Sequence, residues 1–414
     1  VNTIPVVNAG PDKTICRNSS TTLSASGAAS YSWSPATGLS CTSCASPSAS
    51  PATTTTYIVT GTNANACTGT DTITVFVNSL PSVNAGTDKT ICAGATAKLV
   101  ATGASGYTWT PSTGLSCTTC YNPVASPTST ATYILSGTDT NGCTNNDTLT
   151  VNVNSLPAVS AGPDKAVCNG TAASITATGA TSYVWSPTTG LSCTTCANPL
   201  ATPTTNTTYI VTGTDAHGCI NTDTINISIR PLPVVNAGPD ISICKGTTTT
   251  LSASGASSYS WSPATGLSCT TCARPSASPS ATTSYIVTGT DVYGCFNKDT
   301  VKITVNNTIT VNAGADQSIC VGDAAKLSAT GAPSFTWSPA TGLSCTTCYN
   351  PTATPATTTT YVVSGTDTNG CSNTDTITVT VHALPLIDAG ADESICNGSV
   401  TTVSASGASA YNWT

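Results

Sequence analysis

The chain has 414 residues, and only 7% of them are charged, where a typical soluble domain carries about 25%. Its formal net charge of −7 is small for this length, and no cluster of Lys or Arg is present to attract phosphates. The composition therefore argues against a nucleic-acid partner, and no apolar run is long enough for a membrane span. The lack of an initiator Met and a break inside the last repeat predict an internal segment of a longer polypeptide.

A repeat of 76 residues organises the chain. The stretch YSWSPATGLSCTSC begins at Tyr31 and returns in nearly the same form at Tyr107, Tyr183, Tyr259 and Phe335. Self-similarity at a fixed period is the mark of an array of small domains. We place the repeats at residues 1–77, 78–153, 154–229, 230–305 and 306–381, with an incomplete sixth repeat at 382–414.

Each repeat predicts about seven short strands and no helix. Gly follows two residues after the first Cys in five repeats, and Asn18 stands there in the first, so this turn needs a left-handed residue. Trp33 is expected to point into the core from the third strand, and the turn-rich text after Pro35 to hold one or two short edge strands. The extended segments of the first repeat are 7–16, 21–27, 31–34, 54–62 and 71–77.

These strands predict an all-β fold, a tandem array of immunoglobulin-like β-sandwich domains. The disulfide between sheets that antibody domains contain is missing, because no Cys lies in the middle of a strand. The linkers between repeats are short, and all but the one at Asn306 contain Pro, as in NSLPSV from Asn78. Stiffened connections of this length favour an extended, semi-rigid rod.

Each full repeat contains four Cys, and the 21 Cys of the chain indicate disulfides formed in an oxidising, extracellular compartment. Two of the four form a CxxC pair. A closed zinc site usually combines two such pairs, and a redox pair needs a helix start, so a disulfide that clips a loop explains the spacing better. The pairs are Cys41 with Cys44, Cys117 with Cys120, Cys193 with Cys196, Cys269 with Cys272, and Cys345 with Cys348.

The other two Cys of each repeat leave two arrangements open. If the first turn and the last hairpin of a sandwich lie at opposite ends, the bridge joins neighbouring repeats, such as Cys16 to Cys143 or Cys92 to Cys219. If the strand order differs, Cys16 and Cys67 are partners within one repeat. We expect all of these to be paired: Cys16, Cys67, Cys92, Cys143, Cys168, Cys219, Cys244, Cys295, Cys320 and Cys371.

Acidic residues recur in the first extended segment and in the last hairpin. Calcium at the domain junctions is the one cofactor that they suggest, but no DxDxDG run is present, and a turn Asp ordinarily binds its own backbone. We therefore predict no cofactor, and no recurring constellation indicates an enzyme. The acidic residues are Asp12, Asp88, Asp164, Asp240, Asp316 and Asp392 in the first segment, and Asp139, Asp215, Asp291 and Asp367 in the hairpin.

The pattern VNAGxDxxICxG, YxWSPxTGLSCTxC, TTTYxVTGTDxxGC and TDTITVTV covers the whole chain. It resembles the PKD-like and immunoglobulin-like repeats of large cell-surface adhesins of Bacteroidota. The resemblance implies export by type IX secretion, a role in adhesin stalks, and O-glycosylation of Thr in Asp-Thr-apolar triplets. The matching residues are Thr72, Thr148, Thr224, Thr300 and Thr376.

We therefore expect a structural repeat segment of an extracellular, disulfide-stabilised rod or filament, on the cell surface or shed. The expected partners are neighbouring repeats or further copies of the chain. The alternative is a module that binds surface glycans through the last hairpin of each repeat. Because that hairpin varies while the framework stays fixed, the scaffold role is favoured; the hairpins are residues 63–66, 139–142, 215–218 and 291–294.

Overall fold

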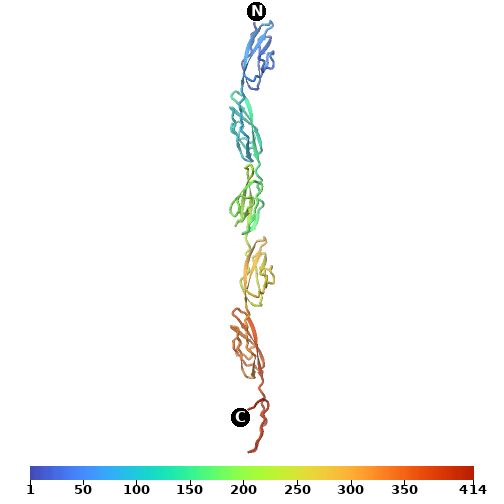
Figure 1. Ribbon diagram of the computed structural model, residues 1–414, viewed down its shortest axis with the longest axis vertical. Coiled ribbons are helices and arrows are strands. Elements are labelled where there is room, and N and C mark those ends of the chain that lie inside the picture. The colour runs from blue at the N-terminus through green and yellow to red at the C-terminus, as the bar shows by residue number, and fades with distance from the viewer. The chain divides into compact units, whose positions relative to one another are not determined.

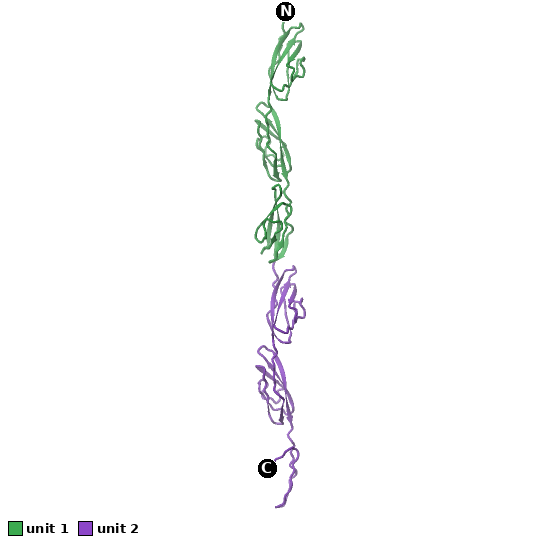
Figure 2. Cartoon of the chain, viewed as in Figure 1, with its two compact units in different colours: residues 1–229 green, residues 230–414 purple.

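The computed structural model describes all 414 residues, and every regular element in it is a strand. The chain divides into two compact units, Val1–Ile229 and Arg230–Thr414 (Figure 2). Three complete repeats lie in the first unit, and two complete repeats with the partial sixth lie in the second (Figure 1). No segment forms a helix long and apolar enough to cross a bilayer.

Each complete repeat contains six strands. In the first they are β1 (Lys13–Cys16), β2 (Thr21–Thr22), β3 (Ser30–Ser34), β4 (Ser48–Ala49), β5 (Thr55–Thr62) and β6 (Thr68–Asn78). In the second they are β7 (Lys89–Cys92), β8 (Ala97–Lys98), β9 (Gly106–Thr110), β10 (Val124–Ala125), β11 (Ala131–Thr138) and β12 (Thr144–Asn154). In the third they are β13 (Lys165–Cys168), β14 (Ala173–Ser174), β15 (Ser182–Ser186), β16 (Leu200–Ala201), β17 (Thr207–Thr214) and β18 (Ile220–Arg230).

The fourth repeat contains β19 (Ile241–Cys244), β20 (Thr249–Thr250), β21 (Ser258–Ser262), β22 (Ser276–Ala277), β23 (Thr283–Thr290) and β24 (Phe296–Asn306). The fifth contains β25 (Gln317–Cys320), β26 (Ala325–Lys326), β27 (Ser334–Ser338), β28 (Thr352–Ala353), β29 (Thr359–Thr366) and β30 (Ser372–His382). The expected seventh strand is absent. The expected extended piece at the start of the repeat accounts for this, because before β1 it forms only one isolated bridge, between Asn8 and Ser26. The turn-rich run after Pro35 adds β4 and a bridge between Leu39 and Ala49, as the one or two short strands expected there.

Two sheets face each other in every complete repeat. In the first repeat a four-stranded sheet has the order β1-β6-β5-β3, and a two-stranded sheet joins β2 to β4. The β1 strand runs parallel to the end of β6, with Cys16 opposite Asn78, while β5 pairs antiparallel with both β6 and β3. The same order recurs in the other four repeats, so the chain is an all-β tandem array of immunoglobulin-like β-sandwich domains.

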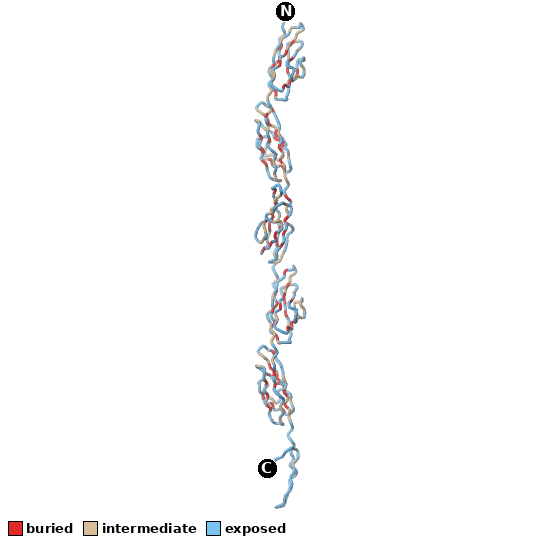
Figure 3. Tube along the Cα trace, viewed as in Figure 1, coloured by how far each residue is buried: buried red, intermediate tan, exposed pale blue.

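Alternation along the strands builds the core. In β5, Tyr57 and Val59 are fully buried while their neighbours Thr56 and Ile58 are exposed, and Ile73 and Val75 of β6 lie on the same inner face. The predicted position of Trp33 is confirmed, because its side chain is only 3% exposed and packs in this cluster. Figure 3 shows the buried positions between exposed ones along every complete repeat.

The predicted left-handed turn after β1 is also confirmed. Asn18 has a φ of 70°, and the Gly residues at the same position of the other repeats have positive φ too, as at Gly94 (84°). Residues with a side chain rarely adopt this conformation, and Asn and Gly tolerate it best. This turn directs the chain from the large sheet to the small one.

Candidate functional site

The junction between consecutive repeats is built from the two ends of the last strand. In the second repeat, Cys143 lies directly before the start of β12. In the first repeat, Cys16 of β1 lies opposite Asn78, at the end of the neighbouring strand β6. The linker runs onward from Asn78, so Cys16 lies beside the exit of its own repeat. Cys67 precedes β6 and is therefore separated from Cys16 by the length of this 11-residue strand.

The structure accordingly joins cysteines of neighbouring repeats. The Cα atoms of each bonded pair lie 5.5 or 5.6 Å apart, within the usual range for a disulfide, and 127 residues separate the two in sequence. No described bridge joins two such cysteines of one repeat. The described bridges are Cys16–Cys143, Cys92–Cys219 and Cys244–Cys371, and Cys168 and Cys295 are also disulfide-bonded.

Cys67 and Cys320 are free, contrary to the expectation that every such cysteine is paired, and Cys396 is free as well. The register of the described bridges explains this, because in each of them the first-turn Cys is bonded to the hairpin Cys of the following repeat. Within these 414 residues no repeat precedes Cys67. These same residues contain no hairpin of a sixth repeat that could supply the partner of Cys320.

The hairpin that presents the bridging cysteine is organised by its Asp. The Asp139 Oδ1 accepts hydrogen bonds from the backbone N–H groups of Asn141 (2.8 Å) and Cys143 (2.9 Å). The same carboxylate contacts recur at Asp215, Asp291 and Asp367, and the Asn63 amide oxygen makes them in the first repeat. This is the backbone-binding turn expected of Asp, and it fixes the cysteine at the end of the repeat.

A second contact ties the linker to the same hairpin. The Asn145 Nδ2 donates to the carbonyl oxygen of Pro81 at 3.0 Å, and Asn221 and Asn297 reach Pro157 and Pro233 in the same way. Asn373 makes this bond to Ile309, in the linker without Pro. Within each of the two units, the junctions between complete repeats therefore combine a held linker with a disulfide.

Sequence reasoning missed the role of the Asp in the Asp-Thr-apolar triplet. The Asp71 Oδ2 accepts the backbone N–H of Ala9 at 2.7 Å, which fastens the entering segment of the repeat to β6. Asp12 works in the reverse direction, because its Oδ1 accepts the N–H of Thr74 at 2.8 Å. Both contacts recur in the other four complete repeats. Their only advance signal was an Asp at a fixed place in every repeat.

In the complete repeats these Asp residues are thus engaged with backbone N–H groups, and no three His, Cys, Asp or Glu side chains converge on a potential metal site. The hydrogen bond from Ala9, followed by one from Thr72, lowers the pKa of the Asp71 carboxyl. The pKa values of Asp223, Asp299 and Asp375 are lowered by the corresponding bonds. Charged carboxylates therefore stabilise the folded repeats.

We expect acid to destabilise the repeats through these carboxylates. Because their folded pKa values lie below the unfolded value of about 3.9, the stabilisation is complete above that pH and is lost as the pH falls through the lowered values. Thermal melting between pH 7 and pH 2 measures the loss. Replacing Asp71, Asp223, Asp299 and Asp375 with Asn should make the melting temperature depend less on pH. The control Glu393→Gln, which removes an exposed acid, should not change this dependence. A melting temperature independent of pH would contradict the assignment.

The CxxC pair closes the loop beneath the buried Trp. In the first repeat the Cα atoms of Cys41 and Cys44 lie 6.1 Å apart in a disulfide, and Trp33 Nε1 donates to the Cys44 carbonyl at 3.0 Å. The Tyr57 hydroxyl donates to the carbonyl of Thr37 at 2.8 Å and holds the other side of the loop. The disulfide, the indole and the phenol together fix the shape of this turn-rich run.

The same bridge closes this loop in the other four complete repeats, and the Cα atoms of each bonded pair lie 6.0 Å apart. The carbonyl of the second Cys again accepts a hydrogen bond from the buried indole. Trp185 Nε1 donates to the Cys196 carbonyl at 3.0 Å, and Trp261 Nε1 donates to the Cys272 carbonyl at 3.0 Å. With their sulfurs bonded to each other, these cysteines offer no thiolate to a metal ion. The bonded pairs are Cys117 with Cys120, Cys193 with Cys196, Cys269 with Cys272, and Cys345 with Cys348.

The threonines of the Asp-Thr-apolar triplets lie on the outer face of the last strand. Thr72 is exposed between the partly buried Asp71 and the buried Ile73. Thr148, Thr224, Thr300 and Thr376 occupy the same exposed position, and no hydrogen bond within the chain engages any of the five hydroxyls. A group attached there would extend away from the core.

No family model matches the chain, and no curated protein matches it. Solved structures similar to it include the eight N-terminal Ig domains of Down syndrome cell adhesion molecule (13% identity, TM-score 0.31, 91% of this chain and 60% of that one). Human desmocollin-1 ectodomain matches at 12% identity and TM-score 0.21, over 90% of this chain and 98% of that one. A Ca²⁺-stabilised, ice-binding adhesin of an Antarctic bacterium matches at 13% and 0.26, over 73% and 100%.

This chain therefore spans 60% of the length of the first of these structures. At such identities and TM-scores the likenesses carry no argument about binding or activity. What the chain's own sheets establish is a tandem array of immunoglobulin-like β-sandwich domains.

Proposed function

We propose that the chain is a structural repeat segment of an extracellular surface rod or filament, either the stalk of an adhesin or a filament subunit. The observation that carries the proposal is the disulfide between consecutive repeats, as in Cys16–Cys143. A bridge inside one domain stabilises that domain alone, whereas a bridge between domains restricts their relative motion. Such bonds persist outside the cell and are rare in the reducing cytosol.

The junctions support a role in resisting tension. Two covalent connections lead from the first repeat into the second, the linker that follows Asn78 and the Cys16–Cys143 bridge, and the pairing of β1 with the end of β6 places them side by side. The hydrogen bond from Asn145 to Pro81 further limits movement of the linker. With only 7% charged residues, the surface depends on hydroxyl groups for hydration, so salt has little to screen.

The hairpin atoms that recur between repeats also favour the scaffold over glycan binding by the hairpin. Asp139 Oδ1 and Cys143 are engaged inside the junction, and the residues between them vary from repeat to repeat. A binding surface repeated for one ligand would be expected to keep its contact residues. The neighbouring repeats and further copies of this chain are the partners that we propose.

Electron microscopy of native material, with and without reducing agent, tests the proposal. We expect straight segments several repeats long in oxidising buffer, and markedly more curved ones after reduction. Unreduced material that is as flexible as the reduced material would overturn the structural role. Lateral packing of many chains would favour a filament subunit, and single strings ending in a different domain would favour a stalk.

We further propose that the exposed threonines of the Asp-Thr-apolar triplets carry O-glycans, as the resemblance to Bacteroidota surface adhesins implies, along with type IX export. Five free hydroxyls at one repeat position support this. Peptides of the native material that contain one of these threonines should then exceed their sequence mass by one glycan mass. Thr72→Val should remove one such increment, and Thr74→Val, the matched control two residues on, should remove none. An unmodified native mass would contradict the assignment.

A further inference from the structure

The fifth repeat departs from the others at one aromatic residue. Tyr31 in the first repeat accepts a hydrogen bond from the N–H of Ala28 and donates one to the carbonyl of the same residue, both at 3.0 Å. Tyr107, Tyr183 and Tyr259 do the same in the next three repeats. Phe335 occupies this position in the fifth repeat and has no hydroxyl.

The missing phenol leaves a donor and an acceptor side by side. Neither the N–H nor the carbonyl of Ala332 has a hydrogen-bond partner within the chain. Pro333 follows, so the next backbone N–H is missing as well; in the first repeat that group, on Ala29, binds the carbonyl of Thr62. One ligand oxygen about 3 Å from both groups of Ala332, beside the edge of the Phe335 ring and not at the position of the phenol oxygen itself, would satisfy the pair.

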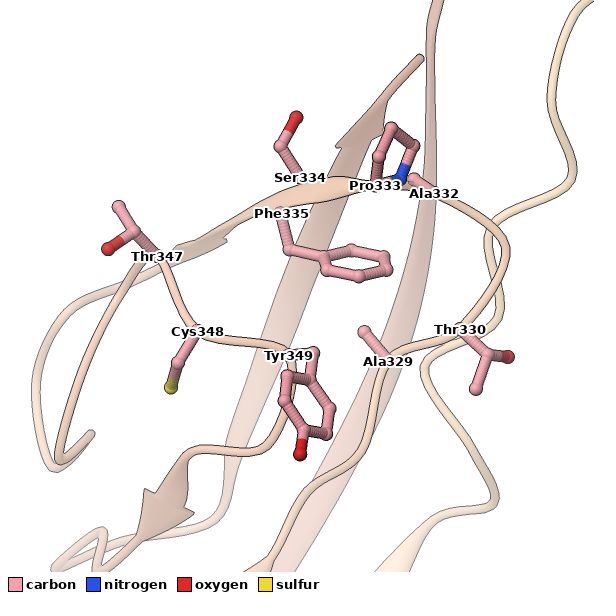
Figure 4. A pocket seen from close by; sticks show the side chains of 9 residues that line it. All are labelled: Ala329, Thr330, Ala332, Pro333, Ser334, Phe335, Thr347, Cys348 and Tyr349. Carbon is pink, nitrogen blue, oxygen red and sulfur yellow. The ribbon is translucent and has the colours of Figure 1, made fainter. Parts of the chain in front are cut away.

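These groups border a pocket of about 360 Å³ (Figure 4). The Phe335 ring lies on the side of Ala329 and Ala332, and Tyr349 projects from the neighbouring loop. Tyr349 is 61% exposed, and Ala occupies this position in the first, third and fourth repeats. An exposed aromatic face thus lies close to the N–H and carbonyl of Ala332, which a hydroxyl group could bind.

The loop that carries Tyr349 is held in place. The Tyr349 carbonyl accepts the N–H of Ala329 at 2.7 Å, and the carbonyl of the preceding Cys348 accepts Trp337 Nε1 at 2.9 Å. Cys348 is also bonded to Cys345. A ring on a loop fixed at three points loses little freedom when a ligand stacks on it, which favours binding.

We propose that this pocket binds a neutral sugar unit. A hexose presents a hydroxyl that can replace the missing phenol at Ala332, and an apolar face that can stack on Tyr349. Thr330, Ser334 and Thr347 are among the residues that line the pocket, and no charged side chain lines it, so an anionic sugar has no counter-charge. This binding role is additional to the structural one and does not depend on it.

Saturation-transfer NMR on the whole 414-residue chain tests the pocket. The probes are the methyl glycosides of glucose, galactose, mannose and N-acetylglucosamine, and we expect transfer to at least one of them. Phe335→Tyr restores the phenol of the other repeats, fills the hydroxyl site and should weaken binding about tenfold, as the loss of two neutral hydrogen bonds implies. Tyr349→Ala should weaken it about fivefold by removing the stacking face.

Both variants introduce residues that other repeats already have at these positions, so they are expected to fold, and circular dichroism verifies this. Tyr121→Ala is the matched control: Tyr121 is equally exposed in the second repeat, but Tyr107 fills the hydroxyl site there. This control should leave binding unchanged. The proposal fails if no sugar shows transfer, if Phe335→Tyr binds as well as the parent chain, or if Tyr121→Ala weakens binding as much as Tyr349→Ala.

Discussion

Under force, the reduced chain is expected to extend at least about 430 Å further than the oxidised chain. The Cys16–Cys143 bridge alone encloses 127 residues, and each residue of an extended chain spans roughly 3.4 Å. While this bridge is intact, those residues cannot be drawn out even if their repeat unfolds. Single-molecule force spectroscopy, pulled from both termini with and without reducing agent, measures the difference.

A chain with Ser in place of Cys143, Cys219, Cys295 and Cys371 is the control for this experiment. It keeps all five CxxC pairs, each of which encloses only a few residues, so its extension should depend little on the reducing agent. If the parent chain extends equally in both buffers, the bridges between repeats do not form in the protein. If the Ser variant still responds strongly, other pairings limit its extension.

The period of the Trp-containing stretch was enough to predict the domains as strand-built sandwiches, because strands such as β5 alternate clearly between buried and exposed residues. The repeat period could not predict the disulfide partner of Cys16, because that partner depends on which strands are neighbours in the sheet. The parallel contact of β1 with the end of β6 places Cys16 at the exit of its repeat. No local pattern encodes this contact, so both pairings were compatible with the sequence.

The shape of the turn-rich run after Pro35 was not predictable, for a different reason. Its Ser, Thr and Pro residues have no periodicity, and its shape is imposed by side chains from elsewhere, such as Trp33 Nε1 and the Tyr57 hydroxyl. The pocket of the fifth repeat was hidden in the same way. Phe335 is visible in the sequence as a substitution, but its meaning rests on the bonds that Tyr makes to Ala in the other repeats.

The Trp109→Ala variant is expected to unfold the second repeat, or nearly so. Trp109 is 1% exposed, and its removal leaves a cavity that costs about 3–5 kcal/mol. The Cys120 carbonyl, which accepts Trp109 Nε1 at 3.1 Å, also loses its partner. A domain of this size is stable by only about 4–11 kcal/mol, so the loss is comparable to the whole.

Hydrogen exchange followed by mass spectrometry locates this effect along the chain. Peptides from the second repeat should lose roughly a hundredfold to several thousandfold in protection, while peptides from the first and third repeats keep most of theirs, because each repeat packs its own core. Tyr121→Ala, at an exposed position of the same repeat, should change protection little. Equal losses in all three repeats would instead show that the bridges Cys16–Cys143 and Cys92–Cys219 couple the domains into one cooperative unit. A cavity in the second core cannot otherwise destabilise the first and third cores, because they share no side chain with it.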